Sequence, residues 1–166
     1  MTRKMLIVVV LGGLASPLIG VIPAGAQACT ISGNDGANNL VGTSSGDVIC
    51  ARGGNDRVLG RGGADELKGG GGRDTIYGGG RGDTLRGGRG RDVLQGQARG
   101  DVIRGGAGAD TLIGGGGADT LRGGDGNDVI DASDNTTDAV RGGEGFDICF
   151  VDPFDAVTGC NRVVLS

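Results

Sequence analysis

The sequence predicts a solenoid, a fold in which short repeating units stack on one another. An aspartate returns at a constant nine-residue step from Asp47 to Asp128. Glycine-rich residues precede each aspartate, and an aliphatic residue follows it two places later, so that the unit reads G-G-x-G-x-D-x-U-x. A fixed short period is typical of solenoids, because each unit buries its apolar side only against its neighbours.

Two units carry the pattern most completely: GGAGADTLI from Gly105 to Ile113, and GGDGNDVID from Gly123 to Asp131. They resemble the hemolysin-type calcium-binding repeats, the RTX nonapeptides. The resemblance covers residues 33–131, which are eleven units of nine residues. It implies an all-β fold, a right-handed parallel β-roll, whose ends we expect to be fastened by disulfides. In this family, six glycine-rich residues form a turn, three form a short strand, and successive turns alternate between two edges.

The composition excludes other repetitive proteins. Glycine makes up 40 of 166 residues, but there are only 3 prolines and no glycine at every third position, which excludes collagen. A flexible glycine-rich linker would not keep an aliphatic residue in phase. Here the phase holds at Leu40, Ile49, Val58, Leu67, Ile76, Leu85, Leu94, Ile103, Leu112, Leu121 and Ile130.

Residues 1–28 differ from the repeats and predict a secretory signal peptide. Arg3 and Lys4 precede an apolar run over residues 5–11, and small residues between 24 and 28 offer a cleavage site. A retained membrane anchor is disfavoured, because glycines and prolines interrupt the run well below the roughly 20 apolar residues that a span needs. Secretion would leave 14 basic and 20 acidic residues, since two of the 16 basic residues lie in the signal, for a net charge of −6.

Residues 29–50 are interpreted as an N-terminal cap with the first repeats. The chain has four cysteines, Cys29, Cys50, Cys149 and Cys160, and an even number in an exported chain predicts disulfides with three possible pairings. With two units per turn and about 4.8 Å per strand, the ends of eleven units lie about 26 Å apart, too far for a disulfide. We therefore predict Cys29–Cys50 and Cys149–Cys160. A lipidated Cys29 is the alternative, and it would leave Cys50 unpaired.

The regular repeats, residues 51–131, carry the candidate metal ligands. Glycine tolerates positive φ, so a glycine-rich turn can direct several carbonyl oxygens at a cation, and Ca²⁺ takes six to eight oxygen ligands. The resemblance implies Ca²⁺ between stacked turns, with the alternation defining two edges. The candidates on the first edge are Asn38, Asp56, Asp74, Asp92, Asp110 and Asp128. Those on the second are Asp47, Asp65, Asp83, Asp101 and Asp119, with Asp138 and Asp147 extending the phase irregularly.

The two edges differ at the fourth position of the unit. The first edge always has glycine there, whereas the second has Ser45, Gly63, Arg81, Arg99 and Gly117. Arginine at a glycine position costs backbone strain, and a guanidinium can pair with a carboxylate. We therefore predict that the first edge carries the better Ca²⁺ sites and that Arg81 and Arg99 partly replace the ion beside Asp83 and Asp101. The alternative is that both arginines extend into solvent.

A basic column is predicted from the same phase. Lys68, Arg86, Arg104 and Arg122 occupy the last position of units two apart, so they should stack at about 4.8 Å on one face. This face could bind an anionic cell-surface polymer, which makes a surface-interaction or adhesion module with structural calcium the alternative function. A solvated face without a ligand is the other interpretation. No nucleic acid partner and no membrane span after signal removal are expected.

Residues 132–166 are interpreted as irregular last repeats and a C-terminal cap, because all three phenylalanines lie there and a solenoid must cover its last apolar rung. The chain has no histidine, which removes Ser-His-Asp triads and most zinc sites, so catalysis is not expected. The leading prediction is calcium binding by a secreted β-roll. Stacked aspartates repel one another without metal, so Ca²⁺ affinity and folding should be coupled.

Overall fold

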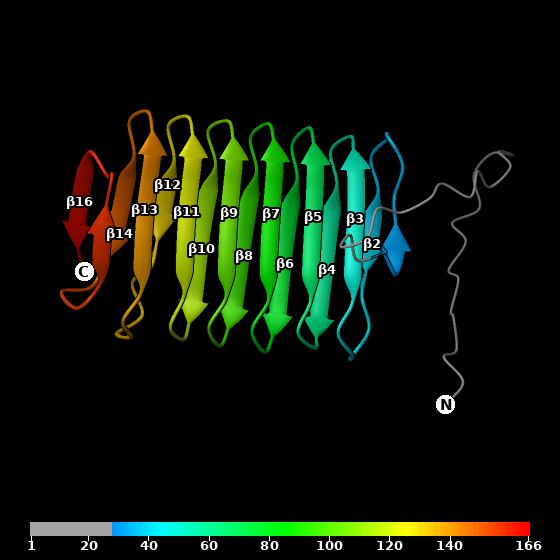
Figure 1. The fold of residues 1–166 in the computed structure, drawn as a ribbon, viewed down its shortest axis with the longest axis horizontal. Helices are drawn as coiled ribbons and strands as arrows, with labels where there is room; N and C mark the ends of the chain where they lie inside the picture. Colours follow the sequence, from blue (N-terminus) through cyan, green and yellow to red (C-terminus); the bar gives the residue numbers. More distant parts are fainter. Residues whose placement is uncertain (1–27) are drawn as a thin grey trace, which may run out of the picture.

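The structure, a computed structural model, describes residues 28–166, and within that range it contains strands and no helix (Figure 1). The predicted signal peptide, apart from its last residue, lies outside the described residues. Two eight-stranded sheets, here called sheet A and sheet B, account for all the strands. Odd-numbered strands form sheet A and even-numbered strands form sheet B, so the chain crosses to the other sheet after every strand.

Most strands are six residues long, and they become shorter near both ends of the stack. Sheet A contains β1 (Ile31–Ser32), β3 (Val48–Gly53), β5 (Glu66–Gly71), β7 (Thr84–Arg89), β9 (Val102–Ala107), β11 (Thr120–Asp125), β13 (Ala139–Glu144) and β15 (Ala156–Thr158). Sheet B contains β2 (Asn39–Val41), β4 (Arg57–Gly62), β6 (Thr75–Gly80), β8 (Val93–Ala98), β10 (Thr111–Gly116), β12 (Val129–Asp131), β14 (Ile148–Val151) and β16 (Arg162–Leu165).

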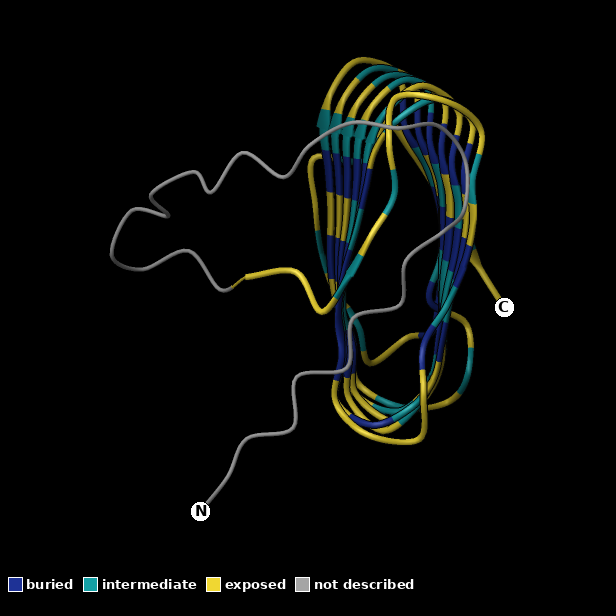
Figure 2. Ribbon diagram, turned by 90° about the vertical axis from the view of Figure 1, so that its right-hand side faces the viewer, coloured by how far each residue is buried: buried dark blue, intermediate teal, exposed yellow. Residues whose placement is uncertain are grey.

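Neighbouring strands are parallel, and in the regular repeats their paired residues are 18 positions apart. Leu67 pairs with Leu85, and Leu85 pairs with Ile103. Two nonapeptides therefore make one turn, and the turns stack into a solenoid of about eight turns whose cross-section is a flattened loop (Figure 2). The all-β parallel roll predicted from the repeat is confirmed.

The core is the narrow space between the two sheets. The in-phase aliphatic residues from Leu40 to Ile130 all lie there, each at most 3% exposed. Side chains alternate in direction along a strand, so the aspartate two places earlier and the glycine two places later face the same interior. Each turn of the roll is thus lined by one aliphatic, one acidic and one glycine position from each sheet.

The strands are longer than the family resemblance implies. A strand such as β6 takes the last three residues of one unit and the first three of the next, and only Arg81, Gly82 and Asp83 connect it to β7. The expectation of three-residue strands and six-residue turns is wrong. Pairing continues past the first glycine because the second glycine adopts positive φ, as at Gly79, and so returns the chain to the register of its neighbour.

Both predicted disulfides are present. The Cα atoms of Cys29 and Cys50 are 5.9 Å apart, and those of Cys149 and Cys160 are 6.1 Å apart. Each bridge joins residues near one end of the stack. Because the Cys29 sulfur is bonded to Cys50, lipidation of that thiol is contradicted.

The phenylalanines do not cover the last apolar rung. Phe146, Phe150 and Phe154 are 55%, 37% and 70% exposed. The core instead continues into buried Cys149 and Val151, with further partly buried residues packed against it. The aromatic cap is therefore a wrong prediction, and the physical reason is that β13 to β16 continue the solenoid, with the phenylalanines on its outside.

No helix within residues 28–166 is long and apolar enough to cross a membrane.

Candidate metal centre

The repeat aspartates line the two narrow edges of the roll. Every predicted aspartate from Asp47 to Asp147 is at most 8% exposed, although each begins or immediately precedes a strand at a turn. Asn38, the first residue of the series, is only partly buried. Charged side chains are rarely this buried without a partner, so the position of these carboxylates needs an explanation.

A hydrogen-bond ladder along each edge provides a partner for one oxygen of the buried carboxylates. The main-chain N–H of Asp74 donates to Oδ1 of Asp92 at 2.8 Å, and the N–H of Asp92 donates to Oδ1 of Asp110 at 2.8 Å. The same bond recurs at all thirteen predicted positions, from Asn38 and Asp47 to Asp138 and Asp147. Each carboxylate in the ladder therefore accepts, through Oδ1, a main-chain N–H of the preceding turn on the same edge.

Two residues that the sequence reasoning missed end the ladders. Asp155 Oδ1 accepts the N–H of Asp138, and Asn161 Oδ1 accepts the N–H of Asp147. They lie 17 and 14 residues after their donors, whereas the regular spacing is 18. Because Asp155 and Asn161 do not fall at the nine-residue spacing, the repeat pattern does not identify them.

The first turns differ from the rest in the hydrogen-bond partners of their side-chain oxygens. Asp47 Oδ2 accepts the N–H of Thr43 at 2.7 Å and its hydroxyl at 3.0 Å. Asn38 Oδ1 accepts the N–H of Asn34 at 2.8 Å. Asp47 Oδ2 and Asn38 Oδ1 therefore have hydrogen-bond donors within their own turns, whereas Oδ2 of the later aspartates has none.

Eleven carboxylates each keep one buried oxygen without a hydrogen-bond partner. These oxygens are Oδ2 of Asp56, Asp65, Asp74, Asp83, Asp92, Asp101, Asp110, Asp119, Asp128, Asp138 and Asp147. An unpaired buried acceptor costs about 1–3 kcal/mol, and more when it is charged. Eleven such atoms in two columns are not a random packing defect; they form a feature that a cation or a proton would stabilise.

The surroundings of Oδ2 are further oxygen atoms. A methyl group placed on Gly105 would collide with Oδ2 of Asp110 and would lie 2.7 Å from the carbonyl oxygen of Gly123, one turn further. The corresponding contacts recur at Gly69 and Gly87, so the missing side chain at the first position leaves space that the carboxylate enters. A carboxylate beside a main-chain carbonyl of the next turn is a set of acceptors without a donor.

Burial changes the acidity of these groups. It raises the pKa of Asp74, Asp83, Asp92, Asp110 and Asp119 to about 6 and that of Asp101 to about 7, against the hydrogen bond from the preceding turn, which lowers each of them. Neighbouring carboxylates on the same edge raise the pKa further, as Asp83 and Asp119 do for Asp101. The aspartates are thus held in a site that disfavours their negative charge.

This donor set fits Ca²⁺. Carboxylate and carbonyl oxygens are the ligands that Ca²⁺ prefers, and it tolerates irregular geometry. In the described residues no three acidic side chains gather around one point, so a site needs main-chain carbonyls of the turns as well as aspartates of stacked turns. A bound divalent cation would supply positive charge where burial and like-charge repulsion both oppose the carboxylates.

Comparison with known families agrees with this geometry. The RTX calcium-binding nonapeptide repeat (four copies) matches residues 32–67, 51–80, 77–98 and 95–130, which together cover most of the chain. The chain belongs to the RTX calcium-binding repeat family. No curated protein matches the chain. Calcium is therefore the ion of these repeats, and the RTX roll is a fold for binding and structure.

The arginines of the second RTX edge do not replace an ion. Arg81 and Arg99 adopt φ of 75° and 81°, in the left-handed region that the glycine pattern of the repeat predicts. Both are exposed, and within residues 28–166 neither guanidinium comes within 4.0 Å of a carboxylate. The predicted pairing with Asp83 and Asp101 is wrong, because the side chains leave the turn toward solvent.

Glycine at the fourth position of the first RTX edge has a steric cause. A methyl group on Gly108 would overlap the carbonyl oxygen of Gly90, and one on Gly90 would overlap that of Gly72. The N–H groups of Gly72, Gly90 and Gly108 also donate to the next turn at 2.7–2.8 Å. Close stacking is not confined to the first edge, because a methyl group on Gly63 or Gly117 of the second edge would overlap the main chain of the preceding turn in the same way. The edges differ in that only the second carries residues other than glycine at this position, namely Ser45, Arg81 and Arg99.

The predicted basic column is confirmed and is longer than expected. Lys68, Arg86, Arg104 and Arg122 pair in succession on sheet A, and Arg141 follows them. Sequence phase missed Arg141 because the preceding repeat has ten residues, so the arginine no longer falls at the ninth position.

Proposed function

We propose that this RTX chain is a secreted calcium-binding module whose folding is coupled to Ca²⁺. The observation that carries the proposal is the pair of columns of buried Oδ2 atoms, eleven in all, without a hydrogen-bond donor. Metal binding at these atoms would stabilise only the folded chain, because the turns that bring them together do not exist in the unfolded chain. Two disulfides support an oxidising compartment outside the cytosol.

The coupling predicts a calcium-dependent transition. In chelator at pH 8 we expect the chain to show little β structure by far-UV circular dichroism. Millimolar Ca²⁺, the range of extracellular modules, should restore it cooperatively. Mg²⁺ at the same concentration should not, since it prefers small octahedral sites and keeps its waters. A spectrum that is already rich in β structure in chelator at this pH, and unchanged by Ca²⁺, would contradict the proposal.

We further propose that the first edge binds Ca²⁺ more tightly than the second. Arg81 and Arg99 support this difference in two ways, because they place positive charge on turns of the second edge and strain its backbone. The ligands of the first edge are Asn38, Asp56, Asp74, Asp92, Asp110, Asp128 and Asp147, and those of the second are Asp47, Asp65, Asp83, Asp101, Asp119 and Asp138.

Replacing both arginines by glycine tests this difference between the edges. In Arg81→Gly/Arg99→Gly we expect the weaker phase of the Ca²⁺ isotherm, measured by titration calorimetry, to shift several-fold toward tighter binding. Removing two exposed arginines from the outer face of sheet A, in Arg104→Gln/Arg122→Gln, is the charge-matched control and should shift it less. If the wild-type isotherm has a single phase that neither variant alters, the two edges are equivalent.

A second candidate function is surface interaction, with calcium in a structural role. The basic column on sheet A favours it, because five cations in register stand on a chain whose formal net charge is −4. The proposed roles are binding roles rather than catalysis: the chain lacks histidine, and its buried acids are engaged in a repeating ladder.

A further inference from the structure

The outer face of sheet A has a shallow groove of ≈ 420 Å³ at its C-terminal half. It runs across β9, β11, β13 and β15. Val102, Thr120 and Ala139 line it together with Arg104, Arg122 and Arg141. The groove therefore follows the axis of the stack, perpendicular to the strands, and crosses one arginine per turn.

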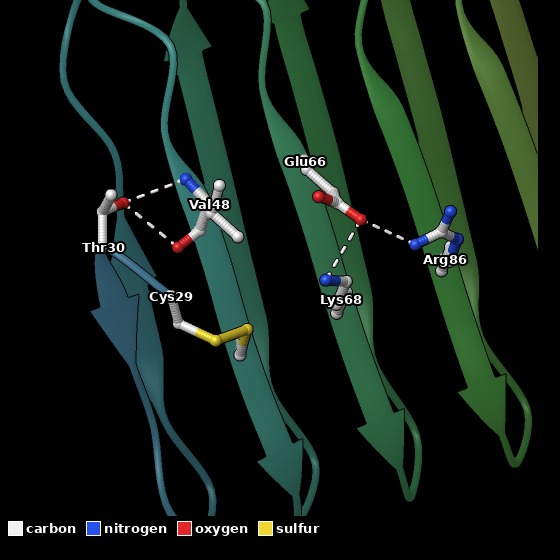
Figure 3. A network of polar contacts seen from close by, with 7 residues as sticks. Cys29, Thr30, Val48, Glu66, Lys68 and Arg86 are labelled. Carbon is white, nitrogen blue, oxygen red and sulfur yellow. Dashed lines mark hydrogen bonds and ion pairs between the residues drawn. A yellow bond between two sulfur atoms is a disulfide. The ribbon is translucent and has the colours of Figure 1, made fainter. Parts of the chain in front are cut away.

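The three arginines of the groove differ from the two cations that precede them in the column. Glu66 lies 3.0 Å from Lys68 Nζ and 2.7 Å from Arg86 Nη1, so both cations at that end of the column have a carboxylate partner (Figure 3). Arg104, Arg122 and Arg141 are exposed, and within residues 28–166 none has a carboxylate within 4.0 Å. The column thus divides into a paired end and an unpaired end.

Small uncharged residues keep the unpaired end open. The strand position that holds Glu66 on β5 holds Thr84, Val102, Thr120 and Ala139 on the following strands of sheet A. The acids that share β11 and β13 with the arginines are Asp125 and Glu144, three residues further along each strand and so about 10 Å away. The guanidinium groups are free to meet an external anion.

The spacing of the arginines indicates the kind of anion. Paired strands lie about 4.8 Å apart, so the three guanidinium groups repeat at roughly that interval along a straight line. An arginine binds a carboxylate or sulfate group through two parallel hydrogen bonds. An extended acidic polysaccharide presents such groups at intervals comparable with one sugar residue. Single-stranded nucleic acid fits less well, because its sites use aromatic side chains as stacking platforms and none lines this groove.

We propose that the groove formed by Arg104, Arg122 and Arg141 binds a linear acidic polysaccharide along the axis of the roll. This site rests on the surface-interaction function proposed above and on a folded roll. It depends on calcium only through the fold, because the groove lies on the face of sheet A and the aspartate columns lie at the edges of the roll.

The test measures binding of heparin, a linear sulfated polysaccharide, to the chain in saturating Ca²⁺ by titration calorimetry. We expect Arg104→Gln/Arg122→Gln/Arg141→Gln to weaken binding by at least about tenfold, a loss of about 1.4 kcal/mol. Arg57→Gln/Arg89→Gln/Arg162→Gln removes the same charge elsewhere and should change binding by less than about twofold. Equal losses in both variants, or no heparin binding by the wild-type chain, would overturn the groove.

Two further measurements separate this proposal from its neighbours. Circular dichroism of each variant in Ca²⁺ must match the wild type, so a failure of calcium-coupled folding is recognised independently of heparin. Single-stranded DNA of equal charge is then used as competitor. Weak competition supports the polysaccharide, whereas competition as strong as that of free heparin would overturn the assignment of the ligand class.

Discussion

The metal-free chain is expected to fold at pH 5 and to unfold as the pH rises through 6 to 7. Burial raises the pKa of five aspartates to about 6 and that of Asp101 to about 7, from an ordinary value of 3.8. Between these limits the folded chain holds more protons than the unfolded chain, so the free energy of unfolding falls as the pH increases. A proton on Oδ2 makes this unpartnered acceptor a hydrogen-bond donor.

Calcium should reverse this pH dependence. Ca²⁺ requires the deprotonated carboxylates, so its binding releases protons and is stronger at pH 8 than at pH 5. The check is urea unfolding followed by circular dichroism across this pH range, once in chelator and once in millimolar free Ca²⁺. We expect stability to fall with pH in chelator and to hold or rise with pH in Ca²⁺. Parallel pH profiles in the two conditions would mean that protons and calcium do not share a site.

Gly69→Ala is expected to damage the site of Asp74 directly. The new methyl group would collide with Oδ2 of Asp74 and would lie 2.7 Å from the carbonyl oxygen of Gly87. Overpacking of this kind costs about 1–3 kcal/mol of unfolding free energy. The variant should also bind less Ca²⁺ than the wild type, because the displaced carboxylate and carbonyl both belong to the candidate donor set.

Gly71→Ala is the matched control in the same turn. A methyl group on Gly71 meets no atom within 4 Å, and this residue is not in the left-handed region. Its unfolding free energy should stay within about 0.5 kcal/mol of the wild type. The two variants are compared by urea unfolding in Ca²⁺ and by calcium stoichiometry from equilibrium dialysis. Equal behaviour of the two variants would mean that the space beside Gly69 is not part of a metal site.

Much of this architecture is predictable from the sequence because the period couples local and global structure. A residue such as Leu85 must face the core in every turn, and the same phase places Arg86 on the outside next to Lys68. The disulfide pairing followed from the distance between the ends of the stack. The shared phase predicts that the aspartates form one functional set, and the structure gives most of them the same buried position and the same unpartnered oxygen.

The parts that sequence could not supply are those that break the period or depend on rotamers. Asp155 and Asn161 end the ladders out of phase, and Arg141 follows a ten-residue unit. Whether Arg81 and Arg99 pair with aspartates or extend into solvent depends on their side-chain rotamers, which the repeat spacing does not determine. Aromatic composition at the C-terminus predicted a cap, but composition carries no information about which side of a strand a phenylalanine occupies.

The ladder of main-chain N–H groups and Oδ1 atoms also makes the roll a polar object with two different ends. At the N-terminal end a surplus carboxylate finds donors within its own turn, as Asp47 does with Thr43. At the C-terminal end the last N–H groups need acceptors supplied from outside the repeat, by Asp155 and Asn161. Because these partners lie in the terminal turns, we expect that whole turns can be removed from the middle of the roll without disturbing either end. A chain truncated before Asp155 and Asn161 would leave one main-chain N–H without an acceptor on each edge. The last turn, which supplies these acceptors, is therefore needed to end the roll.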